Sequence, residues 1–413
     1  MDCAESVRHE KVTLSSTDQN ECVAGAKKLA IVLRPEWNQE NRQSGADSSS
    51  SGISGSGNSS STPNDTSQWQ SQLKHEFFTE GITNQILAVW HEPSGDADRI
   101  LFRIYGVGTD TIIDRKKETQ DMVRMHAAGC GPKVYATFDN GIAYEYINGC
   151  TLDVGSVRDT TMCNRIACEL ARFHRTPLPV DYLNSPQFNS TYFGTHVAKF
   201  VREFPALLPN ADVAKNERFQ REFPQKSWIQ TEFEHICRSV EELFDEYSKM
   251  CKIEGRSIPF PTVVVCHNDL LVKNIVFSQR NNRIRFIDFE YTAPNFAAFD
   301  IANHFAEYAG VDNFNFDLQP DAAHRRKWIE IYMTHWYSFE RGIENPVTNS
   351  KRSQFSHDVI QLDSDVTQVL ALPHFVWACW AAVQAANSTI DFDFLDYGIA
   401  RMKQYAKMSG RHW

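Results

Sequence analysis

The chain has 413 residues, of which 42% are hydrophobic, so it can form one large domain or two smaller domains with a substantial core. A formal net charge of −10 argues against generic binding to nucleic acids or anionic membranes, because both favour basic surfaces. The longest apolar stretches, such as Phe375 to Val383, fall short of the roughly 20 residues that cross a bilayer, so no membrane span is expected. The acidity suits a cationic substrate, although solubility alone explains it equally well.

The amino-terminal residues and the ten cysteines indicate a reduced compartment. The first residues are acidic and lack the apolar core of a secretory signal. The cysteines stand at irregular intervals without a Cys-x-x-Cys pair, so neither a disulfide framework nor a zinc site is indicated. We therefore expect a cytoplasmic protein, and the sequence leaves its oligomeric state open, with a homodimer among the alternatives.

Residues 1–71 are predicted to form an amino-terminal extension. Apolar spacing predicts one helix over about 24–34, where Pro35 ends it. The segment from about Asn41 to Ser67 is rich in Ser, Gly, Asn and Asp, and it has too little apolar content to offset the entropy of ordering. We expect this segment to be a flexible insertion.

Residues 72–147 are predicted to form a small, strand-rich antiparallel lobe. A helix is expected over about 113–128, and a turn containing Gly81, Thr83 and Asn84 joins the first strands. For that turn, a simple hairpin is the alternative interpretation. Alternating or β-branched apolar residues predict strands at Gln85–Trp90, Arg99–Tyr105, Lys133–Phe138 and Ile142–Tyr146.

Residues 148–413 are predicted to be mainly helical. Helices are expected at Asn164–Arg175, Trp228–Met250, Arg325–Phe339 and Leu372–Ala386. His174 stands at the end of the first of these helices. We expect it to be a capping or packed side chain, because no metal-binding residue stands at a matching spacing.

Two aspartates 19 residues apart carry most of the functional information. Asp269 follows the apolar run Val263–Cys266 and precedes Asn274 by five residues. Asp288 follows the apolar run Ile284–Ile287 and precedes Glu290. Both carboxylates are therefore expected to emerge where buried strands end.

This arrangement suits phosphoryl transfer, which needs an oriented acceptor hydroxyl and a metal ion that neutralises the nucleotide. Asp269 is suited to accept the proton, while Asn274 and Asp288 supply the oxygen ligands that Mg²⁺ prefers, with Glu290 as a further ligand. The order Asp-x4-Asn, strand, Asp-Phe parallels the catalytic loop and metal motif of protein kinases. Either half alone is also compatible with a turn or a helix cap, but the two together favour a kinase-like site.

The stretch from His267 to Gly310 resembles the choline and ethanolamine kinases. Leu270-Leu271-Val272-Lys273 is more similar to the ethanolamine kinases, since choline kinases usually carry Gln-Glu-Gly there. The resemblance covers most of the chain from about Gln72. It implies an α+β, protein-kinase-like two-lobed fold and the ATP- and Mg²⁺-dependent phosphorylation of ethanolamine, the first step of the CDP-ethanolamine route. Choline or another amino alcohol is the alternative acceptor, and a silent nucleotide-binding scaffold is the alternative to an enzyme.

The resemblance also assigns nucleotide-binding positions. The turn with Gly81, Thr83 and Asn84 covers the phosphates, and Arg103 replaces the lysine of protein kinases, with Glu118 as its partner. Without the downstream motifs, a surface arginine and a solvated glutamate would be the simpler interpretation. The interlobe hinge, whose backbone reads adenine, is assigned to Glu145, Tyr146 and Ile147.

By the same resemblance, Tyr291, Glu307, Trp377 and Trp380 line the ammonium pocket. Aromatic faces attract a cation through their quadrupoles, and Glu307 adds a negative charge. Trp377 and Trp380 stand three apart in a predicted helix, a spacing that core packing also explains. Asp300 is expected to hydrogen-bond the catalytic loop or to cap its own helix.

Overall fold

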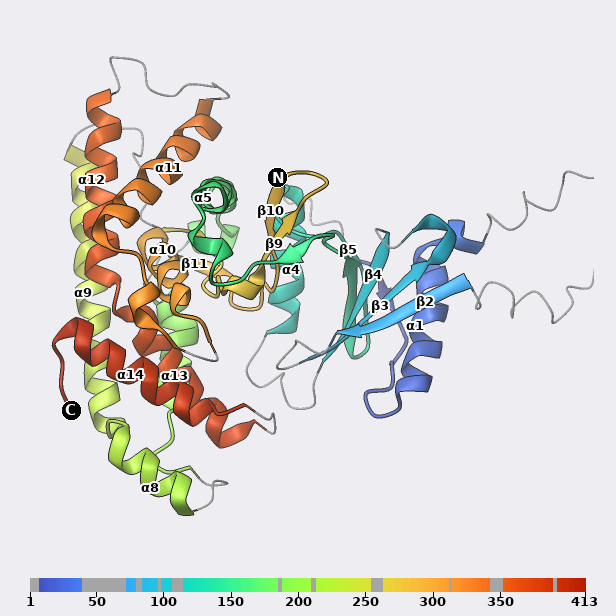
Figure 1. The fold of residues 1–413 in the computed structure, drawn as a ribbon, viewed down its shortest axis with the longest axis horizontal. Coiled ribbons are helices and arrows are strands. Elements are labelled where there is room, and N and C mark those ends of the chain that lie inside the picture. The colour runs from blue at the N-terminus through green and yellow to red at the C-terminus, as the bar shows by residue number, and fades with distance from the viewer. Residues whose placement is uncertain are drawn as a thin grey trace, which may run out of the picture. The chain divides into compact units, whose positions relative to one another are not determined.

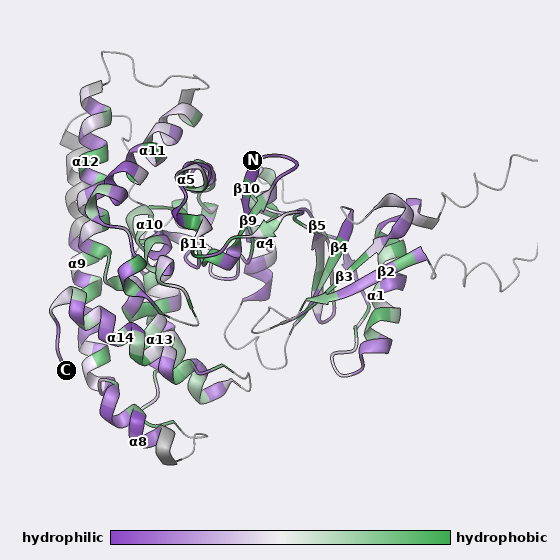
Figure 2. Ribbon diagram, viewed as in Figure 1, coloured by the Kyte–Doolittle hydropathy of each residue, from purple (hydrophilic) through white to green (hydrophobic). Residues whose placement is uncertain are grey.

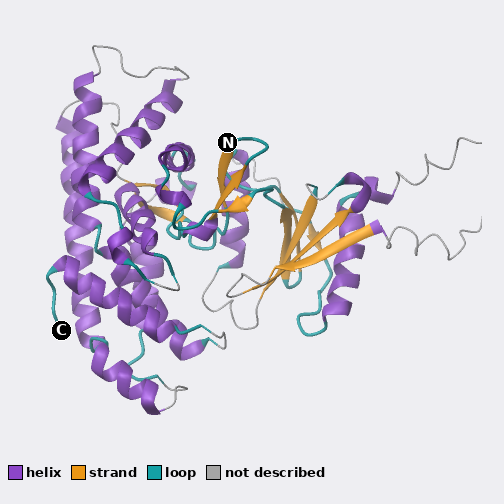
Figure 3. Ribbon diagram, in the orientation of Figure 1, coloured by secondary structure: helices purple, strands orange, loops and turns teal. Residues whose placement is uncertain are grey.

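The computed structural model describes residues 7–38, 72–78, 84–95, 98–105, 114–184, 188–208, 213–253, 263–311, 314–341, 352–388 and 392–413. The Ser-rich segment, Gly81 and Thr83 lie outside these residues. The chain forms two compact units: an amino-terminal unit of residues 1–127 and 131–148, and a carboxy-terminal unit of residues 128–130 and 149–413. Strands dominate the first unit and helices dominate the second (Figure 3).

The amino-terminal unit contains a six-stranded sheet in the order β1-β5-β6-β4-β3-β2. The strands β2 to β6 pair antiparallel, as the sequence predicts. The two-residue strand β1 pairs parallel with β5, so the whole sheet is mixed. The strands are β1 (His9–Glu10), β2 (Leu73–Phe78), β3 (Asn84–His91), β4 (Arg99–Tyr105), β5 (Val134–Phe138) and β6 (Gly141–Glu145).

Helix α1 (Gln19–Leu33) packs against this sheet in a single hydrophobic core (Figure 1). Leu29 and Ala30 of the helix are buried there with residues of β3 and β4, including Phe102. The helix begins five residues earlier than the sequence predicts, because the Asp18 carboxylate accepts hydrogen bonds from the backbone amides of Asn20 and Glu21. Short 3-10 turns follow at Pro35–Asn38 and, after β3, at Glu92–Ser94.

Strand β4 carries the apolar core on one face and Arg103 on the other. Ile100, Phe102 and Ile104 belong to the core that α1 covers. Because successive side chains of a strand point to opposite faces, Arg103 points away from that core. There it meets Glu118 of helix α4 (Arg115–Ala127).

The carboxy-terminal unit is mainly helical, as predicted. Aromatic and aliphatic side chains from most of its helices share one large core. Its α-helices are α5 (Thr160–His174), α6 (Val180–Asn184), α7 (Ala198–Glu203), α8 (Val213–Glu222), α9 (Lys226–Ile253), α10 (Ala297–Ala306), α11 (Ala322–Arg341), α12 (Arg352–Val369), α13 (Leu372–Asn387) and α14 (Phe394–Ser409). Shorter turns lie at Ser156–Arg158, Phe188–Ser190, Phe193–Val197, Val272–Asn274, Glu307–Ala309 and Phe316–Leu318.

Helix α5 begins at Thr160, four residues before its predicted start. The Asp159 carboxylate accepts hydrogen bonds from the backbone amides of Thr161 and Met162 and so caps the helix. The apolar pattern of α5 buries Ile166, Leu170 and Phe173, as the spacing predicts.

The helical run Ser353–Asn387 is long and apolar enough to cross a membrane by composition alone. However, 78% of its most apolar window is buried inside the protein, which is typical of a core helix. Its second half, α13, appears largely hydrophobic in Figure 2 and packs against α10 and α14. Burial in the core therefore explains its apolar composition.

The strands that precede Asp269 and Asp288 in the chain belong to two small sheets. Strand β8 (Val263–Cys266) pairs antiparallel with β11 (Ala293–Phe296). Strand β10 (Arg283–Phe286) pairs with β9 (Ile275–Ser278), and β9 also pairs with β7 (Cys150–Thr151). Asp269 therefore stands three residues after the end of β8, and Asp288 two residues after the end of β10, as expected.

Candidate active site

The loop that carries Asp269 is held in a sparsely populated backbone conformation. Asn268 has a φ of 64°, in the left-handed region that few side chains favour. Its backbone amide donates to Oδ1 of Asp300 over 2.8 Å, and the amide of His267 donates to Oδ2 over the same distance. The Asn268 side chain donates to the backbone oxygen of Tyr291 over 2.9 Å. Surrounding hydrogen bonds thus fix a conformation that would otherwise cost free energy.

Asp300 supports this loop from helix α10, as one of the two sequence expectations proposes. Its carboxylate is fully buried, and it also lies 2.9 Å from Nε2 of His174. The other ring nitrogen of His174 lies 2.8 Å from the hydroxyl of Tyr332. Burial opposes ionisation of Asp300, but the hydrogen bond and charge of His174, the charge of His267 and the backbone amide of His267 together lower the pKa of Asp300 below its ordinary value.

The ligand-type atoms of His174, Cys266 and Asp300 lie within 4.8 Å of one another. The sequence does not reveal this grouping, because the three residues are far apart in the chain. Both carboxylate oxygens of Asp300 already accept backbone hydrogen bonds, and both nitrogens of His174 already have neighbours. The group is therefore best described as a hydrogen-bonded support, with His174 a packed side chain as expected.

Asn274 contacts Asp269 directly. Its side-chain nitrogen donates to the backbone oxygen of Asp269 over 2.8 Å and lies 3.3 Å from Oδ2 of the same residue. Both side chains are buried. These bonds fix the orientation of the Asn274 amide, so that its oxygen points away from Asp269.

The segment that carries Asp288 is bonded to the same loop. The backbone amide of Ile287 donates to the backbone oxygen of Asn274 over 3.0 Å. Nε2 of His267 lies 3.0 Å from the backbone oxygen of Ile287, to which it can donate. Asp288 then adopts a φ of 66°, a second left-handed position in this site. The two sequence motifs therefore form one bonded structure.

Four carboxylates converge on this structure. Burial raises the pKa of Asp269 well above its ordinary value, and the charges of Asp288, Glu290 and Glu307 raise it further. The four acidic groups therefore lie near one another in the carboxy-terminal unit. The arrangement is an acidic centre that favours bound cations.

Three aromatic side chains lie beside this centre and are oriented by hydrogen bonds. The ring of Trp377 packs edge-on against Tyr291, with centroids 5.7 Å apart, and against Trp380 at 5.6 Å. The indole nitrogen of Trp380 donates to the Tyr291 hydroxyl over 2.9 Å. The indole nitrogen of Trp377 donates to Oδ1 of Asn303 over 2.8 Å. The Trp pair thus belongs to the core, and Asn303 also connects Trp377 to the loop that carries Asp269.

Helix α14 adds two aromatic residues that the sequence analysis missed. Phe394 and Tyr397 pack against Trp380 with centroid distances of 5.6 and 6.3 Å. Asp393 caps this helix, and the two rings stand three residues apart on one face. A capping aspartate followed by aromatic residues at this spacing is a signal that could have identified them.

Glu307 is fully buried, and one of its oxygens is already engaged within the protein. Oε1 accepts a hydrogen bond from Nη2 of Arg401 over 2.7 Å, and Arg401 is also fully buried. The sequence predicts Glu307 as a charge for the ammonium pocket but gives no sign of this arginine partner. Burial raises the pKa of Glu307, and the charge of Arg401 acts in the opposite direction.

In the amino-terminal unit, the predicted pair of Arg103 and Glu118 is present. Nη1 of Arg103 donates to Oε1 of Glu118 over 2.7 Å, and the two side chains are only 7% and 2% exposed. Arg115 donates to the other carboxylate oxygen over 3.0 Å. Neither Arg103 nor Glu118 is therefore a solvated surface residue.

The other positions that the sequence predicts to bind the nucleotide are less completely described. Asn84 begins β3 and pairs with Tyr105, and Gly81 and Thr83 are outside the described residues. Glu145 ends β6, and its carboxylate accepts a hydrogen bond from the backbone amide of Lys133 over 3.0 Å. Tyr146 stacks against Phe78 at 6.2 Å, and Ile147 follows it outside regular secondary structure.

A family model described as "Choline/ethanolamine kinase" matches residues 76–406. The chain belongs to the choline/ethanolamine kinase family. It is 31% identical over 399 residues to ethanolamine kinase 1 of Mus musculus, covering 96% of this chain and 92% of the relative. It is also 36% identical over 330 residues to a probable ethanolamine kinase of Nematostella vectensis, covering 79% of this chain and 85% of the relative.

The structure is similar to that of the ethanolamine kinase of Plasmodium vivax, with a TM-score of 0.61 and 26% identity over 81% of this chain and 82% of that chain. This likeness confirms the protein-kinase-like fold, with a mixed β-sheet lobe followed by a mainly helical part. The protein is therefore an ATP-using kinase of the choline/ethanolamine kinase family.

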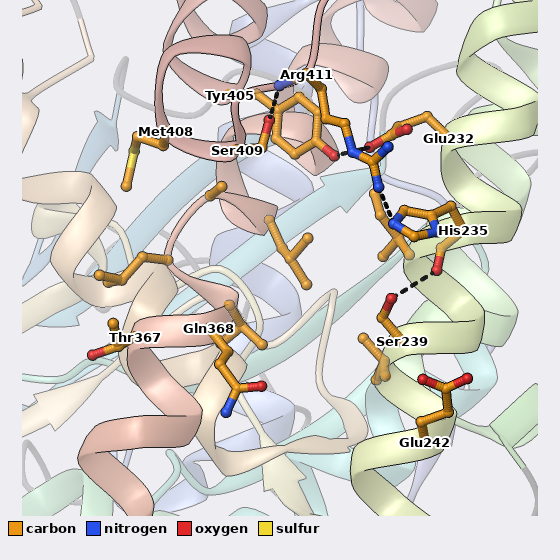
Figure 4. Close-up of a pocket in the computed structure, with 16 residues that line it drawn as sticks. Glu232, His235, Ser239, Glu242, Thr367, Gln368, Tyr405, Met408, Ser409 and Arg411 are labelled. Carbon is orange, nitrogen blue, oxygen red and sulfur yellow. Dashed lines mark hydrogen bonds and ion pairs between the residues drawn. The ribbon is translucent and has the colours of Figure 1, made fainter.

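The carboxy-terminal unit of this kinase also contains a pocket of about 770 Å³ that none of the predicted site residues line. Its walls come from α9, from the junction of α12 and α13, and from the end of α14 (Figure 4). Tyr405 and Arg411 both contact the carboxylate of Glu232 at its rim. The polar groups at this rim bind one another, and we assign no function to the pocket.

Proposed function

We propose that this kinase transfers the γ-phosphate of ATP to the hydroxyl of ethanolamine. One observation carries the proposal: the acidic centre of Asp269, Asp288, Glu290 and Glu307 lies in the same hydrogen-bonded structure as an aromatic cage, which is formed by Tyr291, Trp377 and Trp380. Acidic groups on one side suit a divalent cation, and aromatic faces with a nearby carboxylate suit an ammonium group. A substrate with both a hydroxyl and an ammonium group matches these two features.

In this proposal, Asp269 orients the acceptor hydroxyl and takes its proton. Its side chain follows β8 in a loop fixed by hydrogen bonds, and a positioned carboxylate is suited to act as a general base. Asn274 holds this carboxylate through its side-chain nitrogen. A hydroxyl between Asp269 and the nucleotide would thus be aimed at phosphorus without any covalent help from the protein.

The oxygen donors of the centre fit Mg²⁺. Asp288 and Glu290 supply carboxylates, and the Asn274 amide is turned so that its oxygen is directed away from Asp269. Hard oxygen ligands of this kind are the ones that Mg²⁺ prefers. Bound there, Mg²⁺ would supply charge neutralisation for the nucleotide phosphates. In the amino-terminal unit, Arg103 is the proposed phosphate-binding cation, held by Glu118.

Ethanolamine is favoured over choline by two observations. The relatives described above carry the names ethanolamine kinase and probable ethanolamine kinase. The residues after Asp269 are Leu270-Leu271-Val272-Lys273, which resemble the ethanolamine kinases. Choline is the second candidate, because the family description includes both substrates.

Steady-state kinetics of the purified protein test the proposal. ATP turnover is measured with Mg²⁺ and ethanolamine, with choline, and without an amine, and each assay is repeated with EDTA. We expect the highest kcat/KM with ethanolamine and no amine-dependent turnover in EDTA. A higher kcat/KM with choline would reject the substrate assignment, and turnover of neither amine would reject the proposed function.

A further inference from the structure

Glu307 and Arg401 form a fully buried ion pair, although 94 residues separate them in the chain. Glu307 begins the short turn after α10, and Arg401 lies in the middle of α14. Both side chains have an exposed fraction of 0%. Burial of two charges is costly unless their geometry is well defined, so this pair needs a structural or functional explanation.

The guanidinium of Arg401 is held by two aromatic rings and by a histidine. It lies 5.1 Å from the ring centroid of Tyr397 and 5.5 Å from that of Phe314. Nη1 lies 3.4 Å from Nδ1 of His374, and burial together with the charge of Arg401 keeps the pKa of His374 well below its ordinary value. A neutral imidazole can accept from Arg401 there. These contacts fix the position from which Nη2 reaches Glu307.

The second oxygen of Glu307 has a different environment. Oε2 is buried and has no hydrogen-bond partner among the residues that the structure describes. A buried carboxylate oxygen without a donor costs free energy, and native structures rarely retain one without a reason. An incoming ligand that carries N–H groups would satisfy this oxygen.

The surroundings of Oε2 indicate which ligand this is. Tyr397 contacts both Arg401 and Trp380, and Trp380 is hydrogen-bonded to Tyr291. The negative charge of Glu307 also acts on Asp269, the proposed proton acceptor, and helps to raise its pKa. Glu307 therefore lies near both the aromatic side chains and Asp269, where its free oxygen can meet the ammonium group of an amino alcohol.

We propose that Arg401 is a positioning residue, which holds Oε1 of Glu307 so that Oε2 accepts a hydrogen bond from the substrate ammonium. This inference rests on the proposed function, because it needs an amine substrate. Arg401 does not touch the substrate in this account. It fixes one oxygen of the carboxylate and leaves the other available, so it acts on amine binding through Glu307.

The alternative is that the pair only ties α14 to the turn after α10. Loss of a purely structural tie would lower thermal stability and would change the KM values for ATP and for the amine together, or change neither of them. Loss of a positioning contact would raise the KM for the amine selectively. The two accounts therefore differ in a measurable way.

The experiment compares Arg401→Met, Arg401→Lys and Glu307→Gln with the wild-type protein, and uses whichever amine the wild-type protein phosphorylates faster. We expect Arg401→Met to raise the KM for the amine by roughly tenfold or more, while the KM for ATP stays within about twofold. Arg401→Lys should raise the KM for the amine less than Arg401→Met does, because lysine keeps the positive charge but lacks the planar, forked guanidinium.

Glu307→Gln keeps the assay informative if Arg401→Met fails to fold. The glutamine oxygen can still accept from Arg401, but an NH₂ group then replaces Oε2 and faces the ammonium. We expect a raised KM for the amine, together with a lower thermal midpoint, because the buried charge of Arg401 loses its counter-charge while its hydrogen bond is kept. Arg411→Met is the matched control, because Arg411 also pairs with a buried glutamate, Glu232, outside the site. It should leave the KM for the amine unchanged.

Two results would overturn the inference. One is a folded Arg401→Met or Glu307→Gln protein with a wild-type KM for the amine. The other is an equal rise in the KM values for the amine and ATP. Both results leave the proposed function standing, whereas a wild-type protein that phosphorylates neither amine removes the proposed function itself.

Discussion

Nη1 of Arg103 donates to Oε1 of Glu118 over 2.7 Å, and both side chains are buried in the amino-terminal unit. Glu118 also binds Arg115, so its carboxylate compensates two guanidinium groups. Removal of one partner of a buried ion pair costs roughly 3–5 kcal/mol. We predict that Glu118→Gln lowers the free energy of unfolding by about 3 kcal/mol and raises the KM for ATP more than the KM for the amine.

Urea unfolding and steady-state kinetics check this prediction. Glu36→Gln is the control, because Glu36 pairs with Arg34 at 3.3 Å but its side chain is 55% exposed. Exposed ion pairs contribute little to stability, so the free energy of unfolding of Glu36→Gln should lie within about 0.5 kcal/mol of the wild-type value. A Glu118→Gln protein as stable as this control would contradict the assigned importance of the buried pair.

Asp300→Asn should disturb the catalytic loop without removing any atom that contacts a substrate. Both oxygens of Asp300 accept backbone hydrogen bonds, from His267 and from Asn268. An asparagine has only one oxygen, so one backbone amide would face an NH₂ group and remain unsatisfied, at a cost of roughly 1–3 kcal/mol. We therefore predict that the free energy of unfolding of Asp300→Asn falls by roughly 1–3 kcal/mol and that its kcat falls about tenfold.

Asp321→Asn is the control for this prediction. Asp321 accepts from the backbone amide of His324 at the start of α11, a capping role that asparagine also performs. Its stability and kcat should stay near the wild-type values. If Asp300→Asn behaves like this control, Asp300 does not hold the loop.

Acidification should destabilise the protein through its buried histidines. Burial lowers the pKa of His304 to about 4, from an ordinary value near 6.5. Between these two values the unfolded chain binds more protons than the folded one, so stability is greatest above pH 6.5 and falls as the pH falls. For His304 alone, the loss between pH 7 and pH 5 is about 2 kcal/mol.

Chemical unfolding at pH 7, 6 and 5 measures this loss. The variant His304→Asn lacks the titrating ring, so its stability should depend less steeply on pH, whatever its absolute stability. The same pH dependence in the variant and the wild type would show that His304 is not responsible.

Tyr291→Phe tests the aromatic cage separately from the acidic centre. The variant keeps the ring that packs against Trp377 but loses the hydroxyl that accepts from Trp380. Without this bond the Trp380 ring is less well oriented, so we expect a several-fold rise in the KM for the amine and a loss of about 1 kcal/mol of stability. The KM for ATP should not change. A wild-type KM for the amine would indicate that the Trp380 orientation does not matter.

The sequence predicts best those features that local runs of residues determine. Each apolar run before Asp269 and Asp288 ends in an abrupt polar turn, which predicts a strand, and the structure has strands at both places. Apolar spacing predicts the starts of two helices too late, at 24 and 164, because the capping residues Asp18 and Asp159 are polar and lie outside that spacing.

Contacts between distant residues could not be predicted in this way. Arg401 stands 94 residues from Glu307, and nothing in the pattern around either residue indicates the other. The same holds for β1, which has two residues and pairs with β5 more than a hundred residues later. Such pairs depend on how the helices and strands pack together, which local periodicity does not encode.

The most direct test of the central claim is the activity and stability of Asp269→Asn beside Asp288→Asn, assayed with Mg²⁺, ATP and ethanolamine. The raised pKa of Asp269 shows that its charge is disfavoured in the fold, so Asp269→Asn should keep or raise the thermal midpoint. We predict that kcat nevertheless falls by about a thousandfold or more in each variant, because one loses the proposed proton acceptor and the other the proposed metal ligand. A folded variant of either kind with near wild-type turnover would contradict the account.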